Sequence, residues 1–129
     1  MNIIIKDIPH KEQRYPTCGD WWFENGELHI RVSKELPAPC RMLIALHELA
    51  EVMMCMANGV TQEDVDKFDM DYEKNRQPGD ESEPGDSVNA PYWKEHGYAT
   101  AIERIVATQM GWPWNEHEKE INGLFDETD

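Results

Sequence analysis

Three ionisable residues interrupt a long apolar stretch of this sequence. His47, Glu48 and Glu51 lie between Arg41 and Ala57, where the other residues are apolar. Burying an unpaired carboxylate is costly, so carboxylates inside proteins are usually paired or bound to a metal ion. On a helix, His47 and Glu51 are about one turn apart and share one face. The pattern therefore predicts that these two side chains bind one cation.

Glu48 lies beside this pair, rotated by about 100° around the helix from His47. In zinc hydrolases with a His-Glu-x-x-His helix, the general base occupies this position. Here Glu51 replaces the second histidine, which gives His-Glu-Leu-Ala-Glu. The five residues alone also fit a purely structural explanation, in which His47 bonds to a buried glutamate or an arginine such as Arg104 pairs with the acids.

A second segment supplies further candidate ligands. His96, Ala99, Thr100 and Glu103 share one face of a predicted helix. Because Ala99 and Thr100 are small, another helix can approach closely there. His96 and Glu103 lie about 10 Å apart along the helix axis, so both would hardly bind one ion. We expect one of them to be the third ligand and the other to support a ligand, with His96 preferred and Glu103 as the alternative.

The elements that position these residues can be read from periodicity and turn signals. Residues 3–8, 20–23 and 28–32 read as strands, and Asn25-Gly26 between the last two is typical of a hairpin. We expect a single α+β domain over residues 1–129. Its predicted parts are an antiparallel sheet and hairpin (1–36), the motif helix (37–58), a second helix (61–74), an acidic loop (75–90), a third helix (91–110) and a last helix (115–125).

Particular residues mark the predicted helix ends. Gly59 is a typical C-terminal stop, and Thr61 with Asp64 resembles a capping box. Asn89 can cap the third helix, with Pro91 in its first turn. The motif helix is apolar nearly all round, which predicts burial on most sides, with Met53, Met54 and Met56 filling the core.

The order of sheet, hairpin, buried His-Glu helix and ligand-bearing helix resembles the minimal zincins, in particular the ImmA/IrrE-type metallopeptidases of phages and mobile elements. The likeness covers roughly residues 28–110. In that family the third ligand is a glutamate, followed by alanine three residues later and an apolar residue six later, and His96, Ala99 and Ile102 fit this frame. Glu51 and His96 would thus have exchanged ligand types, which keeps two histidines and one carboxylate.

The resemblance implies a zincin-like fold and a zinc-dependent metallopeptidase. His47, Glu51 and His96 would hold the zinc ion, and Glu48 would act as the base that activates water. Tyr92 or Tyr98 would stabilise the developing oxyanion. The resemblance also implies a phage origin, and hence a host cytoplasm as the place of action.

Composition narrows the class of partner. Twelve Lys+Arg against 26 Asp+Glu give a net charge of −14, which disfavours nucleic-acid binding and suits a protein or peptide with a basic face. No apolar run reaches the roughly 20 residues of a membrane helix, so no membrane association is expected. Three widely spaced cysteines predict no disulfide framework, in keeping with the cytoplasm. His10, His29 and His117 are expected at the surface.

Two other functions fit the same residues. An acidic phage-type binding or inhibitor protein could use a zincin-like scaffold without catalysis. A nucleotide pyrophosphohydrolase of the MazG kind holds magnesium with a Glu-x-x-Glu motif and a Glu-x-x-Asp motif. Glu48-x-x-Glu51 and Glu63-x-x-Asp66 match these two motifs. The predicted N-terminal sheet argues against this all-helical family.

Overall fold

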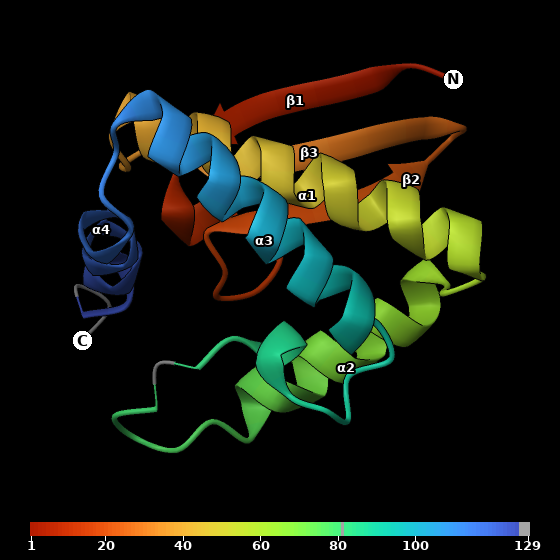
Figure 1. The fold of residues 1–129 in the computed structure, drawn as a ribbon. Coiled ribbons are helices and arrows are strands. Elements are labelled where there is room, and N and C mark those ends of the chain that lie inside the picture. Colours follow the sequence, from red (N-terminus) through yellow and green to blue (C-terminus); the bar gives the residue numbers. More distant parts are fainter. Residues whose placement is uncertain (81, 127–129) are drawn as a thin grey trace.

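A small mixed sheet and helices packed on it make up the fold (Figure 1). The computed structural model describes residues 1–80 and 82–126. The strands are β1 (Ile3–Ile8), β2 (Gly19–Glu24) and β3 (Glu27–Ser33). The α-helices are α1 (Ala38–Asn58), α2 (Gln62–Lys74), α3 (Trp93–Met110) and α4 (Trp114–Asp126), with short 3-10 turns at His10–Glu12 and Pro84–Asp86. The predicted α+β class is confirmed. Within the described residues, no helix has both the length and the hydropathy that a membrane span requires.

The hairpin forms as predicted, but the sheet as a whole is not antiparallel. Asn25 and Gly26 both have positive φ angles, 51° and 75°, as a tight hairpin turn requires. The strand order is β1-β3-β2, with β2 antiparallel and β1 parallel to β3. The expectation of an antiparallel sheet is wrong for β1, because the link over residues 9–18 reverses the chain and β1 takes the free edge of β3.

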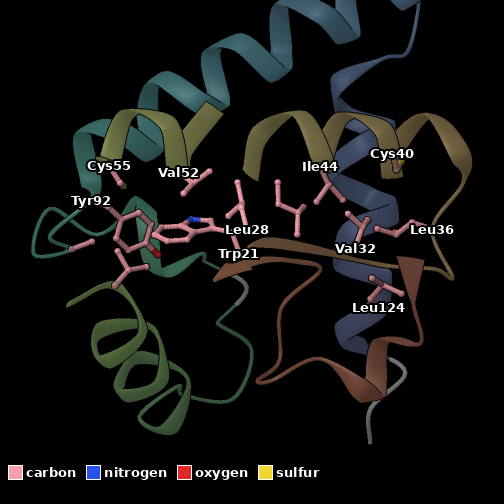
Figure 2. Close-up of a cluster of buried hydrophobic side chains, with 13 residues drawn as sticks. Trp21, Leu28, Val32, Leu36, Cys40, Ile44, Val52, Cys55, Tyr92 and Leu124 are labelled. Carbon is pink, nitrogen blue, oxygen red and sulfur yellow. The ribbon is translucent and has the colours of Figure 1, made fainter. Parts of the chain in front are cut away.

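Helix α1 packs against β3 and β2 and buries the core between them (Figure 2). Leu28, Ile30 and Val32 point from β3 toward this helix and are at most 2% exposed. The helix contributes Cys40, Ile44, Val52 and Cys55. Its C-terminus is closed by Gly59, which has a φ of 75° and donates its amide to Cys55 and Met56 carbonyls. This confirms the predicted helix end.

One side of α1 faces solvent, which corrects the expectation that the helix is buried on most sides. Met42, Met53 and Met56 are 59%, 61% and 54% exposed, so Met53 and Met56 do not fill the core. The apolar pattern extends all round the helix, but the sheet and α3 cover only part of its circumference.

The remaining helices are close to their predicted bounds. The Thr61 hydroxyl accepts the Asp64 amide at 3.2 Å and caps α2, as predicted. Helix α3 begins at Trp93, and Asn89 does not cap it. Asn89 instead lies in a turn, where its backbone amide donates to Ser87 Oγ at 3.2 Å. In the same segment the Ala90 amide donates to the Ser87 carbonyl, and the Trp93 amide donates to the Ala90 carbonyl. Helix α4 begins at Trp114, one residue before the predicted start.

Candidate metal centre

The histidine and the two glutamates of α1 all lie on its buried side. His47, Glu48 and Glu51 are 6%, 9% and 4% exposed. His47 and Glu51 are one turn apart, so His47 Nε2 lies 3.2 Å from Glu51 Oε2. The predicted shared face is therefore present, and it points toward α3.

Helix α3 lies against α1 (Figure 1). It brings His96 to the same point. Ala99 is fully buried at this contact, which lets the two helices approach closely, as its small size predicted. His96 Nδ1 lies 3.0 Å from Glu51 Oε2 and 3.2 Å from His47 Nε2. Arg104, which could have neutralised the acids, lies instead over the Trp114 ring.

The three facing atoms form a nearly equilateral triangle of the size that a tetrahedral ion needs. Their separations are 3.0, 3.2 and 3.2 Å. Ligand bonds of about 2.0–2.1 Å at a tetrahedral zinc ion place its donor atoms about 3.3 Å apart. Two imidazole nitrogens and one carboxylate oxygen are also a donor set that zinc accepts. The residues present therefore fit a zinc ion.

A buried carboxylate holds the far side of the His47 ring. His47 Nδ1 donates to Glu103 Oε1 at 2.8 Å, since an ionised carboxylate can only accept. The second oxygen of Glu103 accepts from His117 Nε2 at 2.5 Å. A neutral His47 ring with its proton on Nδ1 presents the lone pair of Nε2 to the triangle. Glu103 thus supports His47 and does not join the three-atom cluster. Of the two roles considered for Glu103, ligand or support of a ligand, its position corresponds to the second.

The distal atoms of the other two ligand candidates also face polar groups. Trp21 Nε1 donates to Glu51 Oε1 at 3.0 Å, so only Oε2 remains for the cluster. His96 Nε2 faces two carboxylates, with Glu83 Oε2 at 3.1 Å and Asp86 Oδ1 at 3.3 Å. This favours the tautomer with a proton on Nε2 and a lone pair on Nδ1.

The loop that carries these two acids packs flat against the His96 ring. A side chain at Gly85 would place its Cβ atom 2.4 Å from His96 Cγ, so only glycine allows this approach. Glu83, Asp86 and His96 also form a group whose ligand atoms lie within 4.8 Å of one another. Glu83 and Asp86 side chains are 49% and 61% exposed, in contrast to the buried Glu103.

Glu48 lies beside the cluster on the side of β2. Its Oε2 is 3.8 Å from His47 Nε2. A Cβ atom at Gly19 would lie 3.1 Å from Glu48 Cγ and 2.5 Å from Ile44 Cγ2, so this glycine lets β2 approach the helix. Burial raises the pKa of Glu48 well above its ordinary value, and the charge of Glu51 acts in the same direction.

The electrostatics of the cluster favour a positive charge between its members. Burial by itself lowers the pKa of His96, but its contacts with Asp86, Glu51 and Glu83 raise that pKa to about 12. The pKa of His47 is also raised, because the effect of Glu103 and Glu51 outweighs that of burial, which lowers it. Burial acts to raise the pKa of Glu51, yet the two imidazoles lower it to about 2. Protons or a metal cation can supply this positive charge.

The cluster opens into a cavity that several segments share. Residues 15–21, the loop residues 82–85 and the end of α4 line it together with His47, Glu48 and Glu51. Tyr92 also lines the cavity, but its hydroxyl donates to Asp69 Oδ1 at 2.5 Å. Tyr98 is 60% exposed and plays no part in the site. Of the two tyrosines considered as oxyanion donors, only Tyr92 is near.

Three histidines that were expected at the surface are buried or partly buried, and one of them, His117, supports the site. His117 was expected at the surface, but it is fully buried, because α4 packs it against Glu103. His29 and His10 are partly buried as well: His29 stacks on Trp22, and His10 Nδ1 bonds to Ser33 Oγ at 2.7 Å. The partners of these histidines come from other elements, and no local sequence pattern indicates them.

The alternative magnesium site of a pyrophosphohydrolase gains nothing from the geometry. Asp66, of the second acidic pair on α2, binds Arg14, and the groups of potential metal ligands in the described residues include neither Asp66 nor Glu63.

Cys18, Cys40 and Cys55 are free thiols, in agreement with the expectation of no disulfide framework.

Comparison with known proteins found no matching family model, no matching curated protein and no matching solved structure.

Proposed function

We propose that this chain is a zincin-like, zinc-dependent metallopeptidase whose metal ion is held by His47, Glu51 and His96. One observation carries the proposal: two imidazole nitrogens and one carboxylate oxygen meet at 3.0–3.2 Å. The distal atoms of His47 and Glu51 are hydrogen-bonded to Glu103 and Trp21. The distal His96 Nε2 faces the carboxylates of Glu83 and Asp86. Such atoms repel one another at this distance unless protons or a metal cation lie among them, and one metal ion would satisfy all three at once. Dedicated partners for the distal atoms are also typical of metal-bound histidines.

Different residues would bind the metal ion and transfer the proton. A bound zinc ion supplies Lewis acidity and a lowered pKa of water. Glu48, the only other carboxylate of α1, lines the cavity next to His47 and is placed to accept a proton there and pass it to a leaving amine. Glu103 and Trp21 fix the orientation of His47 and Glu51, so that the donor atoms need no rearrangement.

The test distinguishes the proposed role of Glu48 in proton transfer from the metal-binding role of the three ligand residues. We expect Glu48→Gln to retain the metal content of the wild type and to lose peptidase activity by about a hundredfold or more, because a proton acceptor is lost. Activity is measured on a mixture of fluorogenic peptides, and metal content by mass spectrometry. Glu63→Gln, on an exposed position of α2, is the matched control and should change neither.

Undiminished activity of Glu48→Gln would remove Glu48 as the base. A wild type that holds zinc but cleaves no peptide would instead favour the non-catalytic scaffold with a binding role.

A further inference from the structure

The solvent side of α1 carries a regular apolar stripe. Met42, Leu46, Leu49, Met53 and Met56 follow one another at alternating steps of four and three residues. Leu46 and Leu49 are partly buried, and Leu49 also packs against the core. This spacing is that of the seam along which two helices pair. Met42, Met53 and Met56 are more than half exposed. Methionine is enriched in protein interfaces because its flexible side chain adapts to a partner surface.

Strand β1 extends the stripe into a wider apolar face. Ile3 and Ile5 pair with Leu28 and Ile30 of β3, which are buried under α1, so they point to the α1 side of the sheet. They are nevertheless 52% and 48% exposed, because α1 packs against β3 and β2 and leaves β1 at the uncovered edge (Figure 1). The stripe together with Ile3 and Ile5 is called the α1–β1 face below.

The α1–β1 face differs from the rest of this acidic chain in its lack of unpaired acidic side chains. The chain has a net charge of −14, but α1, which is described throughout, exposes no acid: its two glutamates, Glu48 and Glu51, are buried. The same holds for the fully described α3, where Glu95 and Glu103 are buried. On β1, Asp7 is neutralised by Arg41 of α1 at 2.6 Å. Two such chains can therefore meet at this face without bringing carboxylates together.

We propose that the α1–β1 face joins two copies of this chain in a two-fold symmetric dimer, with the two α1 helices in contact. In such a dimer each stripe packs against the same stripe of the other copy, which a self-complementary apolar seam allows. A partner with a basic face fits less well, because α1 exposes no acid and Asp7 of β1 is already paired with Arg41. The inference is independent of the proposed metallopeptidase, since His47 and Glu51 point to the opposite side of α1.

The test measures molecular mass in solution by sedimentation and light scattering. We expect the wild type to have twice the chain mass of 15.0 kDa. Met53→Glu places a charge in the seam at a 61% exposed position, so it should leave the fold intact and raise the dimer dissociation constant by about tenfold or more. Met42→Glu, at the other end of the stripe, should act in the same direction.

Met70→Glu is the matched control. Met70 is also an exposed helical methionine, 41% exposed on α2, but lies outside the α1–β1 face, so its variant should remain dimeric. Circular dichroism checks that all variants are folded. A monomeric wild type at the highest workable concentration would overturn the proposal, and so would folded Met53→Glu and Met42→Glu variants that dimerise as strongly as the wild type.

Discussion

Two buried carboxylates on the wall of one cavity have opposite electrostatic behaviour. Glu103 lies between His47 and His117, and although burial opposes it, these imidazoles lower its pKa. Asp69 lies between the hydroxyls of Tyr15 and Tyr92, and burial raises its pKa to about 7. Burial is similar at both sites, so the partner decides: imidazole stabilises a charged carboxylate, and a neutral hydroxyl compensates only part of the lost hydration. The ionisation of these two carboxylates therefore depends on their particular partners and not on the cavity as a whole.

The largest effect should follow from removing Glu103 itself. Glu103→Ala leaves the rings of His47 and His117 buried without their shared carboxylate, and we expect the free energy of unfolding to fall by about 3–5 kcal/mol. Urea denaturation measures this loss. Glu118→Ala, on an exposed position of α4, is the control and should cost less than about 0.5 kcal/mol. A similar small loss for both would show that Glu103 does not stabilise the cluster.

The second prediction concerns the pH dependence at Asp69. Its pKa is raised in the folded protein, so its contribution to stability is fully present below about pH 4 and is lost as pH rises toward 7. Asp69→Asn cannot ionise and lacks this loss. The unfolding free energy of the wild type, relative to the variant, should therefore fall between about pH 4 and 7, with a slope of up to about 1.4 kcal/mol per pH unit. A constant difference over this range would show that Asp69 titrates normally.

The smallest effects should distinguish the two supports of the imidazole ligands. Glu103→Gln weakens the support of His47, and we expect zinc affinity to fall about 10- to 100-fold. Glu83→Gln weakens the support of His96, but this carboxylate is half exposed, so a two- to fivefold loss, roughly 0.5–1 kcal/mol, is expected. Competition with a chromophoric chelator measures both affinities. An equal loss in the two variants would show that burial of the support makes no difference.

Local patterns predicted the parts of the site that lie within one element. The Asn25-Gly26 turn and the Gly59 helix end follow from backbone conformations that few residues adopt, and both formed as expected. The shared face of His47 and Glu51 follows from helical spacing alone. The axial distance between His96 and Glu103 indicated only that both would not join one ion, and the preference for His96 came from the family resemblance. In the structure His96 Nδ1 lies 3.0 Å from Glu51, and Glu103 contacts the far side of His47.

What the sequence did not indicate depends on packing between elements. His117 lies among polar residues of α4, and only the contact with Glu103 makes it a buried residue. The parallel pairing of β1 depends on the course of the link over residues 9–18, which has no strong turn signal. The exposed methionines of α1 share their pattern with a fully buried helix, because an apolar surface can face a core or a partner equally well.

The metal content of the purified protein tests the central claim most directly. We expect about one zinc ion per chain in the wild type and in His29→Ala, whose imidazole stacks on Trp22 outside the cluster. His47→Ala and His96→Ala each remove one donor of the triangle and should lose the ion. Equal zinc in the wild type and in folded His47→Ala protein would contradict the account.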